Sequence, residues 1–159
     1  MTFRMYRRRA ILKLTASFSL LPLAAACSKD SAGSMTVYKD PNCGCCNGWV
    51  DHVRAAGFDV TVRNEGDMSG MKKRFGVPTE LTSCHTAEIG GYVVEGHVPA
   101  SAIHKLLAER PSAKGLAVPG MPIGSPGMEG ENPSPYDVML FDEAGSHRYM
   151  RFLESNAIS

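Results

Sequence analysis

Hydrophobic and polar positions beyond residue 34 follow periods that change several times along the chain. The run MTVYK at 35–39 has the short, β-rich character of a strand. From Cys46 onward, apolar residues recur at helical spacing, and Gly57 predicts the end of that helix. The alternating run at 58–63 predicts a second strand. Together these elements predict a β-α-β unit.

The rest of the chain predicts less regular elements. They are a short helix at 68–75, strand and turn segments around Cys84 and at 92–95, a helix at 101–110 with Ser101 as its N-cap, a loop at 118–135, and a β-hairpin at 136–152 that turns at 143–145. A β-α-β unit with cysteines at its first strand-to-helix junction, followed by a hairpin, is the plan of a thioredoxin-like domain. We therefore predict an α/β, thioredoxin-like fold with a central sheet, flanking helices and a C-terminal β-hairpin.

The first 26 residues have the pattern of an export signal peptide. Five basic residues lie within the first 13 positions, no acidic residue appears before Asp30, and the apolar run behind the basic residues is too short to cross a bilayer. The pair Arg8 and Arg9 in RRRAILK resembles the twin-arginine export signature, although ordinary Sec signals also carry several arginines. We expect export to the periplasm by one of these two routes.

The residues at the end of this signal are compatible with two ways of processing. PLAAAC resembles a lipobox, with Ala24 where leucine is commonest, and this site would leave Cys27 lipidated and the protein anchored to a membrane. Cleavage after an Ala-x-Ala site would release a soluble protein instead. We expect a signal peptide at 1–26, a flexible polar tether at 27–34, and one domain at 35–159.

Export changes the charge of the protein. Removing the five basic residues of the signal from the 17 of the chain leaves 12 against 16 acidic residues, a formal charge of −4 with histidine neutral. A mildly acidic domain without a basic stripe gives no indication of nucleic-acid binding and suits cations better.

Three of the four cysteines in the expected domain fall within DPNCGCCNGW. Cys43 and Cys46 lie one helical turn apart and can share a disulfide or a metal ion. Cys45 points about a third of a turn away from Cys46, so this pair chelates one ion poorly, and a disulfide between neighbours is strained. Neighbouring thiolates can instead bind different ions of a cluster. The third thiol therefore favours a polynuclear thiolate site over a simple redox pair.

The expected position of these thiols also favours metal chemistry. The positive end of a helix dipole lowers the pKa of a nearby thiol and enriches the thiolate, which is both nucleophile and soft-metal ligand. All-thiolate ligation selects Cu(I) first and Zn(II) next. Cys84 in TSCHT is the fourth thiol, and Pro78 in GVPT is the candidate for a cis-proline loop that brings it near the cysteine helix. The alternative for Cys84 is a lone buried cysteine.

Four further side chains are candidates for accessory ligands. Met121 and Met128 lie seven residues apart in the predicted loop, where their thioethers could pass or cap Cu(I), or simply pack. His85 adjoins Cys84 and could reach the cluster, and His97 in EGHVP could do the same or order a turn.

The segments YKDPNCGCCNGWVDHVRAAGF, GVPTELTSCHTA, GYVVEGHVPA and GLAVPGMPIGSPGME resemble the CopG-like copper-resistance family of small, exported, thioredoxin-like proteins. The resemblance covers about residues 35–152. It implies a periplasmic protein that holds several copper ions on Cys43, Cys45, Cys46 and Cys84, with a Cu(I)/Cu(II) redox role.

Two classes of function follow from these observations. In the first, the protein binds copper ions, limits free copper in the periplasm and passes the metal to copper efflux or copper-chaperone proteins. In the second, Cys43 and Cys46 are the redox pair of a thiol-disulfide oxidoreductase, with Cys45 and Cys84 as resolving thiols. A structural zinc site is a third alternative.

Overall fold

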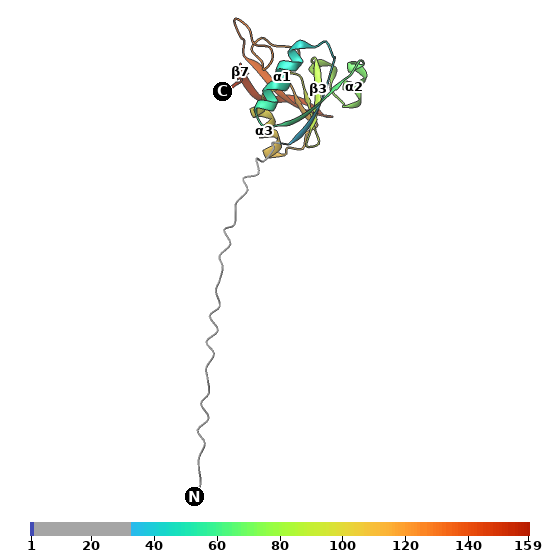
Figure 1. Ribbon diagram of the computed structural model, residues 1–159. Coiled ribbons are helices and arrows are strands. Elements are labelled where there is room, and N and C mark those ends of the chain that lie inside the picture. Colours follow the sequence, from blue (N-terminus) through green and yellow to red (C-terminus); the bar gives the residue numbers. More distant parts are fainter. Residues whose placement is uncertain (2–32) are drawn as a thin grey trace.

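Residues 33–159 contain one mixed sheet of eight strands, in the order β2-β1-β3-β4-β5-β6-β7-β8 (Figure 1). The computed structural model describes these residues and residue 1. The strands are β1 (Ser34–Lys39), β2 (Asp59–Asn64), β3 (His85–Ile89), β4 (Tyr92–Glu95), β5 (Gly115–Ala117), β6 (Tyr136–Asp142), β7 (Gly145–Leu153) and β8 (Asn156–Ile158). β1 pairs parallel with β2, and β4 pairs parallel with β5, whereas the other neighbours are antiparallel. The mixed α/β class, the central sheet and the C-terminal hairpin of β6 and β7 are confirmed.

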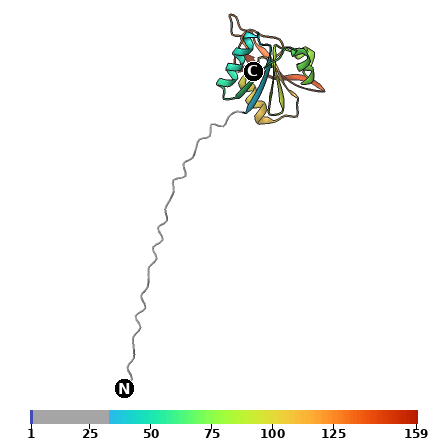
Figure 2. The ribbon, with the colours of Figure 1, turned by 45° about the vertical axis from the view of Figure 1, so that its right-hand side comes forward.

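Helices cover both faces of this sheet. They are α1 (Gly44–Ala55), α2 (Met68–Arg74), the 3-10 helix η1 (Thr79–Leu81) and α3 (Ala100–Glu109). α1 and α3 lie on one face and α2 on the other (Figure 2). Because successive side chains of a strand point to opposite faces, Val94 and Leu116 pack in the core beneath α1 and α3, and Val93 and Ala117 pack in the smaller core on the α2 side.

The apolar side of α1 is the one that its spacing predicts. Cys46, Trp49, Val50 and Val53 are buried on it. The indole N–H of Trp49 donates to the carbonyl of Val98 at 2.8 Å, which ties the helix to the segment between β4 and α3. The first turn of α1, which carries the cysteines, is therefore fixed by the core.

Two local expectations are wrong. α3 begins at Ala100 and is preceded by Pro99 at its N-cap, so Ser101 lies inside the helix. The amide of Ala100 donates instead to Nε2 of His52 at 3.0 Å, so a side chain of α1 caps the N-terminus of α3. Pro78 is not a cis-proline, because the described residues contain no cis peptide bond, and it is the N-cap residue before η1, with an extended ψ of 142°.

The structure does not test several other expectations. Arg8, Arg9 and Cys27 lie outside the described residues, so the export signal and the lipid anchor stay predictions. No helix of the described part is both long and apolar enough to cross a bilayer. The thioredoxin-like assignment of the fold also stays a prediction.

Candidate functional site

The pairing of β1 with β3 places two distant cysteine segments side by side. The strands are antiparallel, with Lys39 opposite His85, so the residues that follow β1 lie next to the residue that precedes β3. That residue is Cys84. After β1, a turn in which the amide of Cys43 donates to the carbonyl of Asp40 at 3.1 Å leads directly into α1. The sheet register therefore brings Cys84 to the start of the cysteine helix.

The pairing of β3 with β4 adds a histidine to the same end of the sheet. Thr86 lies opposite Glu95, and the same register continued one step outward sets His85 opposite Gly96. The amide of Gly96 does donate to the carbonyl of His85, at 3.0 Å. The next pair outward joins residues 84 and 97. The register therefore places His97 opposite Cys84.

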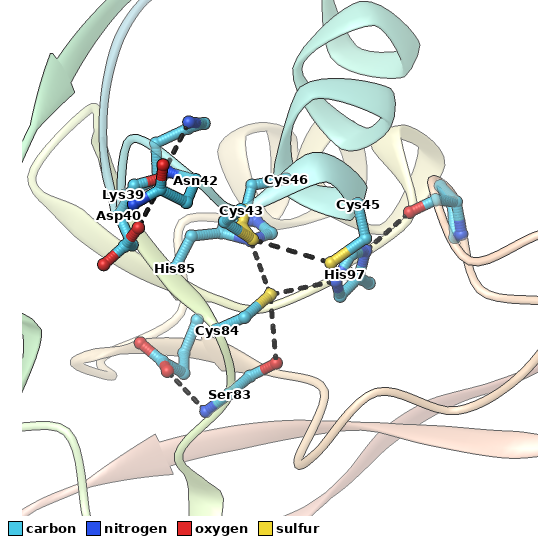
Figure 3. Close-up of a disulfide and its surroundings, with 12 residues drawn as sticks. Lys39, Asp40, Asn42, Cys43, Cys45, Cys46, Ser83, Cys84, His85 and His97 are labelled. Carbon is cyan, nitrogen blue, oxygen red and sulfur yellow. Dashed lines mark hydrogen bonds between the residues drawn. A yellow bond between two sulfur atoms is a disulfide. The ribbon is translucent and has the colours of Figure 1, made fainter.

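The four predicted cysteines form one cluster (Figure 3). Their sulfur atoms all lie within 4.8 Å of one another. Cys43 and Cys46 are joined as a disulfide with their Cα atoms 5.4 Å apart, and Cys45 and Cys84 are free thiols. The Sγ atoms of Cys43 and Cys45 are 3.5 Å apart. An all-thiolate ligand set therefore exists here only after the disulfide is reduced.

Cys84 differs from the other three cysteines in its surroundings. Burial, with a smaller contribution from Cys45, raises the pKa of the Cys84 thiol to about 12. Cys84 precedes a strand and does not lie at the start of a helix. It carries its proton at neutral pH, and a metal ion that binds its sulfur must displace that proton.

Two histidines contact Cys84. Its Sγ lies 3.0 Å from Nε2 of His97 and 3.2 Å from Nδ1 of His85. Both rings have no exposed surface, and burial lowers the pKa of each, that of His85 well below its ordinary value. Trp49 packs against His85, with ring centroids 4.4 Å apart. The structure thus places both predicted accessory histidines beside the fourth cysteine as neutral imidazoles.

The loop that carries the two candidate methionines borders the cysteine helix. A Cβ added at Gly48 of α1 would lie 2.9 Å from Cα of Gly127, so the two backbones touch. Met128 follows Gly127 and is half-buried, and Met121 is 52 % exposed. The loop therefore lies against the site, while a role for either thioether stays a prediction.

A buried ion pair next to Cys84 has no counterpart among the sequence predictions. Lys72 of α2 donates to Oε1 of Glu95 at 2.6 Å, and Glu95 is completely buried at the end of β4. The same oxygen accepts the amide of Ser83 at 2.6 Å, and the other accepts the hydroxyl of Thr86 at 2.7 Å. The only sequence signal is an acidic residue at the end of the apolar run GYVV. This network holds the backbone one residue before Cys84.

The donors in this cluster suit a thiophilic metal. Four sulfur atoms and two imidazole nitrogens match the preferences of copper, and sulfur-rich sets also accept zinc. Cys43 and Cys46 can exchange electrons by opening and closing their disulfide. Metal binding and disulfide exchange would therefore both use the sulfur atoms of Cys43 and Cys46.

Comparisons with known proteins agree with this chemistry. Residues 81–128 match the family described as "Protein of unknown function, DUF411". Two solved structures, "Copper resistance protein copG- Form 2" and "Copper resistance protein copG- Form 1", are each 48% identical to this chain, with TM-scores of 0.72 and 0.71. The matches cover 76% of this chain and 98% and 97% of those chains. Comparison with curated proteins gives no match.

Proposed function

This chain belongs to the CopG-like copper-resistance family, and from that premise we propose that it is a periplasmic protein that binds several copper ions on Cys43, Cys45, Cys46 and Cys84. The observation that carries this proposal is the approach of four sulfur atoms to within 4.8 Å of one another. Its function is copper-related, as the family indicates, and the polynuclear thiolate cluster is our proposal.

The number of sulfur donors supports more than one ion. Cys46 is buried and joined to Cys43, and Cys45 is half-buried on the preceding helical position, with its Sγ 3.5 Å from that of Cys43. Each Cu(I) ion needs only two or three sulfur ligands, and thiolates can bridge neighbouring ions, so four thiolates suffice for more than one ion. Four thiolates also offset the charge of several Cu(I) ions. Met121 and Met128 are proposed to cap or pass ions from the adjoining loop, and His85 and His97 to adjoin the cluster.

The same cysteines can supply the electrons for reduction of Cu(II). Closing the disulfide between Cys43 and Cys46 releases two electrons, which reduce two Cu(II) ions to Cu(I), and two protons, which go to solvent; an external dithiol must reopen the disulfide before the reaction can repeat. We propose that the protein is exported, with lipidation of Cys27 as a means of anchoring, and that it passes copper to efflux or copper-chaperone proteins.

Anaerobic titration of the fully reduced protein with Cu(I) tests the cluster. We expect more than one copper ion per chain. Cys45→Ser should lower that ratio strongly while Cys43 and Cys46 can still form their disulfide. The matched control is Cys27→Ser, which changes a cysteine of the predicted tether and should leave the ratio unchanged. A single Zn(II) ion bound in preference to copper, at one ion per chain, would refute the proposal.

A thiol-disulfide oxidoreductase is the second candidate because the structure contains the Cys43–Cys46 disulfide with the thiol of Cys45 beside it. The standard assay is reduction of insulin. Rapid turnover by the wild type that Cys45→Ser leaves unchanged would favour this second function. We expect no such turnover, because a copper-handling site has no need to dock a protein disulfide.

A further inference from the structure

Closing the disulfide removes two of the four sulfur donors but leaves a second set of donors complete. Sγ of Cys84, Nδ1 of His85 and Nε2 of His97 all lie within 4.8 Å of one another. None of these atoms takes part in the disulfide. The oxidised form of the site therefore still presents one sulfur and two nitrogens to a metal ion.

The ring of His97 is oriented for ligation. Its Nδ1 lies 2.7 Å from the carbonyl oxygen of Pro126. Because a carbonyl can only accept, Nδ1 carries the proton and the lone pair of the neutral ring is on Nε2, which faces Cys84. A hydrogen bond from the remote ring nitrogen to a carbonyl is the usual way in which proteins orient a metal-binding histidine. The loop that supplies this carbonyl is held against α1 at Gly127.

His85 has hydrogen-bonding capacity that the described residues leave unused. Its ring is completely buried, and Nε2 has no partner among them. Nδ1 faces Cys84 at 3.2 Å, and in the tautomer that carries the proton on Nε2 it presents a lone pair to the same sulfur as His97 does. A cation in place of the thiol proton of Cys84 could accept the lone pairs of both rings at once.

The spacing of the three atoms fits a transition metal after a small adjustment. A metal about 2.3 Å from sulfur and about 2.0 Å from nitrogen, at tetrahedral angles, separates the two ligands by about 3.5 Å. The observed separations between sulfur and nitrogen are 3.0 and 3.2 Å. Each pair therefore needs to open by about half an ångström or less. A set of two histidines and one cysteine is one that copper accepts as Cu(II) as well as Cu(I).

We propose that the oxidised protein, with Cys43 and Cys46 joined, binds one Cu(II) ion on Cys84, His85 and His97. The Cys84 proton is released to solvent when the ion binds, and no electron is transferred in this step. This inference rests on the proposed copper function. It means that the disulfide sets how many copper ions the site holds, several when open and one when closed.

Cu(II) binding to the oxidised full-length protein tests this second set. The protein carries Cys27→Ser and Cys45→Ser, so that Cys84 is the only free thiol and cannot reduce the metal by forming an internal disulfide. We expect one Cu(II) ion per chain and an intense thiolate-to-Cu(II) charge-transfer band in the visible spectrum. Cys84→Ala should abolish the band, and His97→Ala should weaken binding at least tenfold. His147→Ala, at an exposed position of β7, is the matched control and should change neither.

Substitution of a buried histidine can disturb folding, so a second measurement uses the protein with both histidines in place. Histidine labelled with ¹⁵N should change the nitrogen hyperfine pattern in the electron paramagnetic resonance spectrum of the bound Cu(II). An unchanged pattern, or the absence of a charge-transfer band in a protein with Cys84 present, would overturn the inference. The parallel Cu(I) titration of the reduced protein decides the proposed function separately, because it depends on the four thiolates and not on the imidazoles.

Discussion

Replacement of Glu95 by glutamine removes the charge from the buried network next to Cys84 while keeping the shape of the side chain. Glu95 is completely buried, and its partner Lys72 has a side chain that is 10% exposed. After the change, the ammonium group of Lys72 remains in the interior with only neutral partners. The amide of Ser83 can still donate to the glutamine carbonyl, so the loss is mainly one of charge compensation.

The size of the effect follows from burial. Removing one partner of a buried ion pair costs about 3–5 kcal/mol, because the remaining charge keeps its desolvation penalty. A domain of this size has a free energy of unfolding of about 5–15 kcal/mol, so Glu95→Gln should remove about a fifth of it or more. Lys72→Met should have a similar cost for the same reason. The double variant Lys72→Met/Glu95→Gln leaves no unpaired charge and should cost clearly less than the sum of the two single changes.

Urea unfolding followed by circular dichroism measures these free energies, with the disulfide kept oxidised in every sample. Glu88→Gln is the matched control, because Glu88 is an exposed carboxylate of β3 whose contact is the hydroxyl of Tyr38 at 3.2 Å. It should change the free energy of unfolding by no more than about 0.5 kcal/mol. A loss below about 1 kcal/mol for Glu95→Gln, or additive single and double variants, would refute the reasoning from a buried charge.

Three further substitutions test how the site is held in place. Trp49→Phe leaves the buried carbonyl of Val98 without its donor and should lower the free energy of unfolding by about 1–3 kcal/mol in urea titrations. Gly127→Ala would place a Cβ 2.6 Å from the carbonyl oxygen of Cys45 at a φ of +83°, so the loop should leave α1, with a loss of about 1–3 kcal/mol and faster alkylation of the free thiols. Asp67→Ala removes the side-chain cap of α2 and should cost about 1 kcal/mol, whereas Asp67→Asn should cost much less.

The hydrophobic pattern predicts the longer elements of this fold and misses the shortest. The helical spacing after Cys46 and the alternation at 58–63 correspond to α1 and β2. β5 and β8 each have three residues, which is too few to show a period of two. The start of α3 is missed because the donor at Ala100 is satisfied by His52, 48 positions earlier in the chain. Such a contact depends on how two helices pack and leaves no local signal.

The sequence predicts the cysteine part of the site better than it predicts the residues that surround the cysteines. Three thiols within four residues predict their own proximity, but the cis-proline loop expected to bring Cys84 to them is absent, and the register of β1 with β3 places it there instead. The contact of His97 with Cys84 depends on the register of β3 with β4, which the sequence does not reveal. The buried pair of Lys72 and Glu95 is equally hidden, because a lysine in a short helix usually faces solvent. Long-range register and burial are the parts that require the structure.

Cys84 is the donor that connects the two proposed forms of the site. It belongs to the four-sulfur set with the disulfide open and to the sulfur and nitrogen set with the disulfide closed. Loss of Cys45 should therefore affect Cu(I) binding alone, and loss of His97 mainly Cu(II) binding, whereas Cys84→Ala should reduce both. Cys84 is half-buried next to the start of β3, so its truncation should reduce metal binding without unfolding the domain. Equal titrations of wild type and Cys84→Ala in both redox forms would contradict a shared donor and leave Cys84 a cysteine with no metal role.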